Sequence, residues 1–170
     1  AWKPYFTTQI GSYGDCGDNL FSCIISDVLH IWGTGNMDDM SYDWDDFYFN
    51  SAPWFNSSEQ KEFSSIKIHH GVKSIGKGAF YGCTDFKSIE IPNSVEIICR
   101  NVFLGCDRLT DIMVNSENQY YCSVDGVLFN KNLTTIVRYP AGKEQYSYKI
   151  PDSVIAIGEF AFYQCHALTS

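Results

Sequence analysis

The sequence predicts an α/β solenoid, and three observations about repetition support this prediction. Nine residues between positions 63 and 83 recur 23 positions later. A third copy begins at residue 145, which is 59 positions after the second copy begins at residue 86. Because 59 is 23 plus 36, residues 109–144 form one stretched unit. A fixed period in this range is typical of stacked repeats, which usually bind other molecules through a long surface.

Each repeat opens with a short strand pattern. Apolar residues lie at spacings i, i+3 and i+5, as in Phe63, Ile66 and Ile68, and this is the leucine-rich-repeat pattern. A second apolar pair follows, such as Val72 and Ile75, and then a small and an aromatic residue, for which we expect a short helical turn. We therefore expect a right-handed superhelix of leucine-rich repeats with short strands on its concave face and little helix.

The residues before the repeats follow another pattern. Residues 18–34 predict a β-hairpin, with strands from Leu20 to Ile25 and from Val28 to Trp32. We expect this hairpin to cap the first repeat, because an unpaired strand edge invites aggregation. We place the boundary between an N-terminal part and the repeats at residue 63. The expected segments are 1–62 with its hairpin cap, and 63–170 with units 63–85, 86–108, 109–144 and 145–167, followed by a truncated repeat.

The stretched unit predicts an insertion. Two strand-like runs, residues 127–129 and 135–137, flank Asn130-Lys131-Asn132. This arrangement predicts a hairpin that projects from the stack. Insertions in repeat proteins often serve binding. The alternative is that the hairpin only spans a longer turn.

Composition and cysteine count limit the possible partners and bonds. The net charge of −8 and the isoelectric point near 4.8 argue against nucleic acid and anionic membrane surfaces as partners. Seven cysteines leave at least one thiol unpaired within the chain. We expect a ladder of buried thiols, because three cysteines share one repeat position: Cys83, Cys106 and Cys165. Cys16 and Cys23 are close enough in sequence to close a small disulfide loop.

Few residues suggest chemistry. Five aspartates between positions 38 and 46 lie among aromatic residues, which could suit Ca²⁺ or a sugar, but the EF-hand pattern is absent. His69 and His70 are adjacent, so their side chains should point in different directions. No catalytic or dinucleotide-binding motif is present. We therefore expect no enzymatic activity, no catalytic residue, no cofactor and no metal site.

The repeat sequences resemble one particular family. Three phrases carry the likeness: GVKSIG at 71–76, AFYGC at 79–83 and IPDSV at 150–154. The stretched unit, with SVDGVLFN at 123–130, resembles a recurring variant of the same family. These phrases are similar to the BspA-like leucine-rich repeats of bacteria and mucosal protists. Three positions depart from the pattern, namely Cys99, Val102 and Gln164.

The resemblance implies a function. BspA-like repeats occur in surface proteins, so the resemblance implies a cell-surface or secreted adhesin. We expect no membrane insertion within this chain, because no apolar stretch approaches the ~18 residues of a membrane span. Its partners would be host matrix proteins, host cells or other microbes. One alternative is a glycan- or Ca²⁺-binding module centred on residues 35–62, and another is a structural spacer that displays a further domain. We expect a longer parent protein, because residues 168–170 begin another strand pattern.

The outward positions of the repeat strands are the candidate partner-binding residues. In a leucine-rich repeat these positions line the concave face and stack into columns. Their mixed polarity suits a hydrated contact with another protein; the alternative is an ordinary solvated surface. The three columns are Lys67, Glu90, Met113 and Lys149; Ser65, Ser88, Asp111 and Ser147; and Ser64, Lys87, Thr110 and Tyr146.

Overall fold

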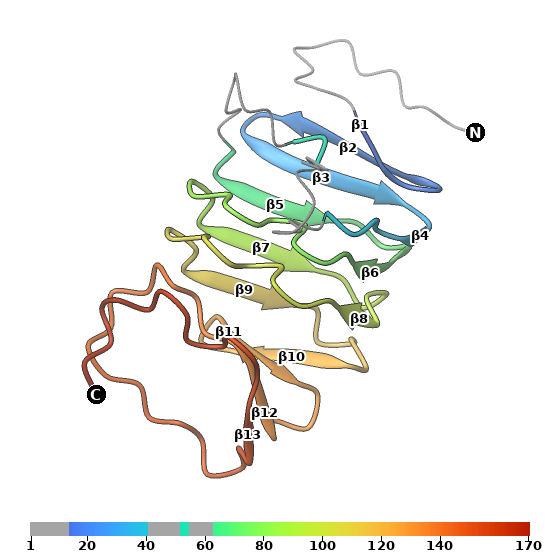
Figure 1. Cartoon of the computed structure of the whole chain (residues 1–170). Helices are drawn as coiled ribbons and strands as arrows, with labels where there is room; N and C mark the ends of the chain where they lie inside the picture. The colour runs from blue at the N-terminus through green and yellow to red at the C-terminus, as the bar shows by residue number, and fades with distance from the viewer. Residues whose placement is uncertain (1–13, 41–51, 55–62) are drawn as a thin grey trace, which may run out of the picture.

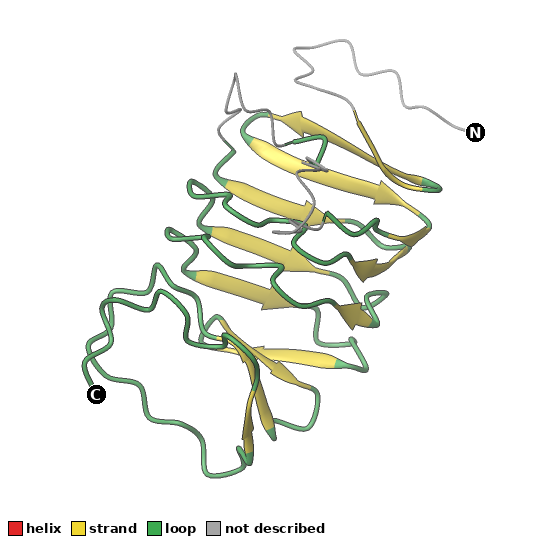
Figure 2. Cartoon of the chain, viewed as in Figure 1, coloured by secondary structure: helices red, strands yellow, loops and turns green. Residues whose placement is uncertain are grey.

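The computed structural model describes residues 14–40, 52–54 and 63–170, and these residues form strands and turns without any helix. The expected α component is therefore wrong for the described chain (Figure 2). Positive φ angles in the segment of the expected helical turn explain the difference. Gly78 and Gly82 have φ angles of 65° and 71°, and Gly105 has one of 73°. Left-handed residues spaced four apart interrupt the dihedral angles of a right-handed helix.

The largest sheet has six strands in the order β1-β2-β3-β5-β7-β9 (Figure 1). β1, β2 and β3 pair in antiparallel fashion, whereas β3, β5, β7 and β9 pair in parallel. Ile66 pairs with Ile89, and Ile89 pairs with Ile112, so the 23-residue period is the register of the sheet. The bounds are β1 Gly14–Gly17, β2 Leu20–Ile25, β3 Val28–Gly33, β5 Ser65–Ile68, β7 Ser88–Ile91 and β9 Asp111–Val114.

A second, smaller sheet runs alongside the first. It consists of β4 (Gly35–Asn36), β6 (Val72–Ile75) and β8 (Ile97–Ile98), which are parallel. The main hydrophobic core contains the apolar side chains of β3, β5, β6, β7 and β9 together with the repeat aromatics. The Phe80 ring stacks on that of Phe103 at 6.2 Å, so the aromatic position of each repeat contacts the next. Stacking of this kind lets neighbouring repeats share one core.

The stretched unit forms a third sheet, in the order β10-β11-β12-β13. Its strands are β10 (Tyr121–Val124), β11 (Val127–Asn130), β12 (Thr135–Arg138) and β13 (Ala156–Ile157). The expected pair of strands is present as β11 and β12, but it does not project. Val127, Leu128 and Phe129 are fully buried, because Leu128 packs in the main core and the other two pack in a second core. A third strand, β10, pairs with β11 on its other side.

The stretched unit begins a second core, and the fourth unit packs against it. Tyr139 stacks on Phe162 at 5.4 Å, as Phe80 stacks on Phe103. The thiol of Cys165 points to the carbonyl of Tyr139 at 3.7 Å, as that of Cys106 points to the carbonyl of Phe80 at 3.2 Å. Tyr139 therefore takes the place of a repeat phenylalanine, and the stretched unit supplies the aromatic ring on which the fourth unit stacks.

The cysteine expectations hold only in part. Cys106 is fully buried, whereas Cys83 and Cys165 are partly exposed, so the thiol ladder is buried at one position of three. Cys16 and Cys23 are free thiols rather than a disulfide. Both lie on the β1–β2 hairpin. Cys16 is on β1 next to the turn, whereas Cys23 is farther along β2, where it pairs with His30 of β3.

Candidate interaction surface

The face of the six-stranded sheet that points away from the core carries most of the candidate residues. We call it the open face, and its central row is Lys67 on β5, Glu90 on β7 and Met113 on β9. These three residues are in register. Lys67 Nζ lies 3.0 Å from Glu90 Oε2, and Met113 is 43% exposed. An exposed ion pair of this kind contributes little to stability, so it is free to exchange for a partner's groups.

One further row lies on the same strands, and another lies just before them. Ser65, Ser88 and Asp111 begin the three strands in register and are partly exposed. Ser64, Lys87 and Thr110 precede them, and the hydroxyl of Thr110 donates to the carbonyl of Lys87 at 3.1 Å. Thr110 Oγ1 also lies 2.7 Å from Asp111 Oδ2, so its one O–H is shared between the two acceptors. The open face therefore presents short polar side chains beside longer charged ones.

The structure does not bring the fourth member of any row to this sheet. Tyr146, Ser147 and Lys149 lie outside every strand, although all three are exposed. The hairpin of β10 and β11 packs against β9 instead, with the N–H of Ile112 donating to the carbonyl of Gly126 at 3.0 Å. Because this position at the end of the sheet is taken, the fourth unit cannot add its strand beside β9.

The fourth unit keeps its own repeat contacts. The N–H of Thr169 donates to the carbonyl of Tyr146 at 2.9 Å, as the N–H of Thr110 donates to that of Lys87 at 2.8 Å. Tyr146 is 76% exposed. The fourth unit therefore keeps the backbone hydrogen bond that joins successive repeats, but its exposed residues are separate from the open face.

A pair of histidines extends the open face onto the hairpin. His30 on β3 is in register with Lys67, and its Nδ1 lies 2.9 Å from Nε2 of His69. Burial lowers the pKa of both imidazoles, and the nearby Lys67 lowers both further while Glu90 opposes it. His70 points elsewhere, with its Nδ1 at 3.0 Å from Asn93 Oδ1. The prediction that the adjacent histidines diverge is therefore confirmed.

Two aromatic residues complete the face beyond the histidines. Phe21 on β2 and Trp32 on β3 are cross-strand partners with ring centroids 6.5 Å apart, and both are partly exposed. The repeat pattern does not assign these residues or His30 to the surface, because they precede the first repeat. The signal was available, because alternation places Phe21, His30 and Trp32 on the same side as Lys67 once the hairpin register is known.

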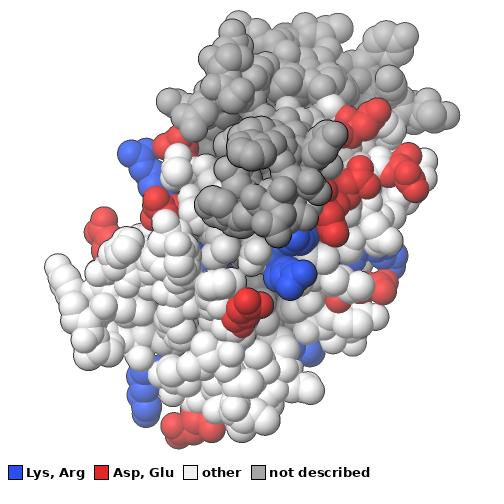
Figure 3. Space-filling view, in the orientation of Figure 1, with Lys and Arg blue, Asp and Glu red and all other residues white. Residues whose placement is uncertain are grey.

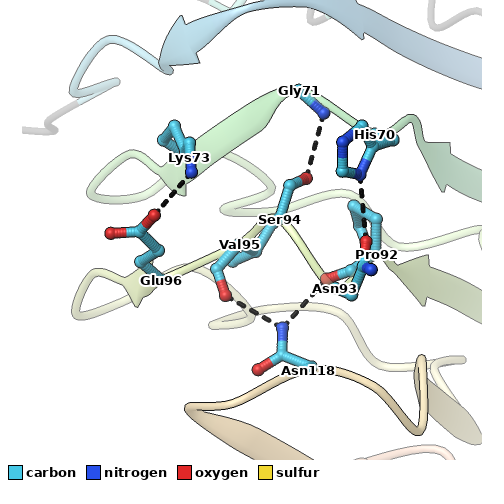
Figure 4. A network of polar contacts seen from close by, with 9 residues as sticks. All are labelled: His70, Gly71, Lys73, Pro92, Asn93, Ser94, Val95, Glu96 and Asn118. Carbon is cyan, nitrogen blue, oxygen red and sulfur yellow. Dashed lines mark hydrogen bonds and ion pairs between the residues drawn. The ribbon is translucent and has the colours of Figure 1, made fainter.

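A polar ladder holds successive repeats in register next to the small sheet (Figure 4). Lys73 Nζ lies 2.6 Å from Glu96 Oε1, and the N–H of Gly71 donates to Ser94 Oγ at 3.0 Å. Asn118 ends the ladder. Its amide donates to the carbonyls of Pro92 and Val95, each at 2.9 Å, while the side chain is fully buried. These contacts are structural, since most of them join residues 23 positions apart within the stack.

On the side that Figure 3 draws, several acidic side chains gather at the upper right of the described surface, with no basic side chain among them. Elsewhere on this side, acidic and basic side chains lie scattered among uncharged ones. This mixture fits a protein partner better than a polyanion, in agreement with the net charge of −8.

The acidic segment is only partly described. Asp43, Asp45 and Asp46 lie outside the described residues. Asp39 belongs to the described part, where its Oδ1 accepts from the N–H of Lys77 at 2.8 Å. Among the residues with described positions, no three histidine, cysteine or acidic side chains come together in a way that could hold a metal ion. The same part of the chain contains no helix of the length and apolarity that crossing a bilayer requires.

Comparison with protein families gives one match. The model of the BspA type leucine rich repeat region matches residues 55–138 and 141–170, with six copies. These ranges include β5, β7 and β9 of the open face, most of the stretched unit and the fourth unit. A comparison with curated protein sequences gave no match.

Three solved structures are similar to this chain. The pneumococcal vaccine antigen PcpA is 16% identical with a TM-score of 0.50, over 95% of this chain and 64% of that one. A leucine-rich repeat protein from Eubacterium ventriosum is 20% identical with a TM-score of 0.45, over 92% of this chain and 58% of that one. A leucine rich cell surface protein from Faecalibacterium prausnitzii is 15% identical with a TM-score of 0.38, over 96% and 76%. The chain thus spans less than two thirds of the first two.

Proposed function

Because the chain belongs to the BspA-type leucine-rich-repeat family, we propose that it binds a protein partner through the open face and serves in adhesion rather than catalysis. Repeat proteins of this class present extended surfaces on which many side chains act together. In this proposal the chain is a cell-surface or secreted module. The partners are host matrix proteins, host cells or other microbes, as the family resemblance suggests.

One observation carries the proposal. The central row of Lys67, Glu90 and Met113 is exposed, in register and continuous with His30 and Trp32 on the hairpin. Aromatic residues and methionine are enriched in the cores of protein interfaces, and polar groups form their rims. The open face combines both kinds of side chain on one rigid sheet, which keeps the ordering cost of binding low.

The finer architecture belongs to the same proposal. We place the concave side of a right-handed solenoid at the open face, and we assign to the β2–β3 hairpin the role of capping it. The pairing of β3 with β5 supports this assignment, because it covers the strand edge of the first repeat.

The test is binding to immobilised matrix proteins and to epithelial cells at physiological salt. The panel contains fibronectin, fibrinogen, laminin and collagen. The test variant combines Lys67→Ala, Glu90→Ala and Met113→Ser on the open face. The matched control combines Lys73→Ala and Glu96→Ala, which removes an equally exposed ion pair of the same 23-residue spacing from β6 and the segment before β8.

The two variants separate the outcomes. Saturable binding that the open-face variant loses and the control keeps supports the proposal. Binding that both variants keep, but that Tyr146→Ala with Lys149→Ala abolishes, moves the site to the fourth unit and contradicts the open face. Absence of binding to any panel member at micromolar concentration would contradict adhesion and favour the spacer hypothesis. A rise in melting temperature with Ca²⁺ or a sugar would favour the alternative site in residues 35–62.

A further inference from the structure

The histidine pair that extends the open face contains a direct contact between ring nitrogens. His30 lies on β3, and His69 follows the last residue of β5. Nδ1 of His30 lies 2.9 Å from Nε2 of His69, and the two rings stack with centroids 5.2 Å apart. At such a distance one ring nitrogen donates its N–H and the other accepts with its lone pair. The contact therefore requires that at least one of the two facing nitrogens carries no hydrogen.

This requirement limits how many protons the pair can hold. With both imidazoles neutral, or with one of them protonated, a donor can still face an acceptor. With both imidazoles protonated, two N–H groups and two positive charges would meet at 2.9 Å, and both encounters are repulsive. The second proton therefore breaks a contact that the first proton leaves intact.

The backbone holds both histidines in place, so the rings are the parts that can move. His30 is paired on both sides, with Cys23 of β2 and with Lys67 of β5. The N–H of His69 donates to the carbonyl of Ile31 at 2.8 Å. Both histidine side chains are partly exposed. Each ring can therefore turn toward water when the contact breaks, without the loss of a strand.

Within the described part of the chain, two charged side chains act on the pair. Lys67 on β5 disfavours protonation of both imidazoles, whereas Glu90 on β7 favours it. These two side chains form an ion pair with Nζ and Oε2 3.0 Å apart, so the charge of Glu90 is already balanced. On the other side, the thiol of Cys23 faces His30, and burial raises the pKa of this thiol, which keeps it uncharged at neutral pH. The surroundings therefore do not offset a second proton on the pair.

We propose that the contact between His30 and His69 is a proton-operated switch in the open face: two protons part the rings, and a partner bound to the face is then released. The release rests on the proposed function, whereas the parting of the rings does not. The pair lies beside Lys67 and Glu90, whose charges cancel, so acid adds positive charge to a region that is balanced at neutral pH. A partner that covers the rings also removes water from them, which disfavours their charged forms. Binding and protonation therefore oppose each other.

Titration of the full chain tests the switch without any partner. Imidazole ¹H–¹⁵N spectra recorded from about pH 7.5 to about pH 4.5 follow the protonation of each ring. We expect His30 and His69 to take up protons in two separated steps. The second step should lie at lower pH than the single step of the histidine that remains in His30→Gln or in His69→Gln, because that histidine no longer faces a charged ring. Independent titration of the two residues, with midpoints that neither substitution moves, would overturn the proposal.

Binding measurements test the release. A matrix protein that binds the chain at about pH 7.4 is measured again at about pH 5.5, and we expect its affinity to fall about 10-fold or more. The double variant His30→Gln with His69→Gln should lose about 2-fold or less over the same range. His70→Gln is the matched control and should behave as the unmodified chain, because His70 contacts Asn93 instead of the pair. Equal losses in the double variant and the unmodified chain would contradict release through this pair. If no matrix protein binds at neutral pH, adhesion fails as the proposed function, while the titration still decides whether the contact is a switch.

Discussion

The backbone N–H of Gly105 donates to the side-chain Oε1 of Gln164 at 3.0 Å, across the 59 positions that separate the second repeat from the fourth. In the first repeat, the corresponding N–H of Gly82 donates to the backbone carbonyl of Leu104 at 2.9 Å. The stretched unit does not supply such a carbonyl to Gly105. The departure of Gln164 from the repeat pattern therefore has a structural role, because its side chain replaces a missing backbone acceptor.

We expect Gln164→Met to lower the free energy of unfolding by about 1–2 kcal/mol, because the N–H of Gly105 would lose its acceptor. Urea denaturation measures the effect. Gln119→Met is the control, because Gln119 is exposed and donates only to the neighbouring carbonyl of Glu117. Equal stability of the two variants would show that water satisfies Gly105 as well as Gln164 does.

Asn118 should be the most sensitive polar residue of the stack. Its amide donates to two carbonyls of the preceding unit, and its Oδ1 accepts from the N–H groups of Tyr120 and Tyr121 at 2.8 and 2.9 Å. Asn118→Ala leaves these groups without partners, so we expect a loss of about 2–4 kcal/mol in urea denaturation. Asn93→Ala, on the exposed part of the same ladder, should cost much less. A loss below that of Asn93→Ala would contradict the role assigned to Asn118.

Acid should weaken the junction between β3 and β5. The pKa values of His30 and His69 lie below the ordinary value of 6.5, because burial and the neighbouring positive charges disfavour protonation. Below pH 6.5 the unfolded chain therefore binds more protons than the folded chain, so stability falls as the pH drops from 6.5 through the lowered pKa values. The charged groups near the two histidines are Lys67 and Glu90. The thiol of Cys23 also faces His30, because Cys23 on β2 pairs with it.

Denaturation midpoints at several pH values between about 7.5 and 5 test this sign. The decline should be smaller in His30→Gln and in His69→Gln. In His70→Gln it should match the unmodified chain, because His70 contacts Asn93 instead of the pair. A decline that His70→Gln reduces and the other two variants do not would assign the acid sensitivity to a different site.

Phe160 and Asn101 occupy equivalent left-handed positions, with φ angles of 56° and 63°. Asparagine tolerates this conformation better than a bulky aromatic residue does. We expect Phe160→Asn to raise the melting temperature slightly, since the relief of about 1 kcal/mol of backbone strain exceeds the loss of a 45% exposed ring. The reciprocal Asn101→Phe should lower it. If both variants lowered it, the contact between the Phe160 and Tyr163 rings would dominate over strain.

Alkylation should distinguish buried from accessible thiols. Cys16 and Cys106 are fully buried, and burial raises the pKa of Cys16 to about 12 and that of Cys106 well above its ordinary value. Both should resist iodoacetamide in the native protein at neutral pH, because the thiolate is the reactive form. Cys122 is partly exposed and should react before either of them. Mass spectrometry gives the order, and modification of Cys106 before Cys122 would contradict the burial described above.

The fold was largely accessible from periodicity. Positions such as Ile66, Ile89 and Ile112 are buried because a strict 23-residue register stacks identical side chains, and this register is visible in the sequence. The expected helical turn was wrong, since the glycines that prevent it act through φ angles and not through hydrophobic spacing. Periodicity shows which residues occupy equivalent positions in successive repeats, but it does not show which residues have left-handed φ angles.

The candidate site divides in the same way. The row that contains Lys67, Glu90 and Met113 can be predicted from the sequence, because its spacing equals the repeat period. The departure of Lys149 from this row could not be predicted, since it results from the β10–β11 hairpin occupying the position beside β9. Only the structure added His30 to the face. The place of His30 depends on the pairing of β3 with β5. The place of Lys149 depends on how a 36-residue unit packs between 23-residue ones, and non-local packing of that kind has no period to reveal it.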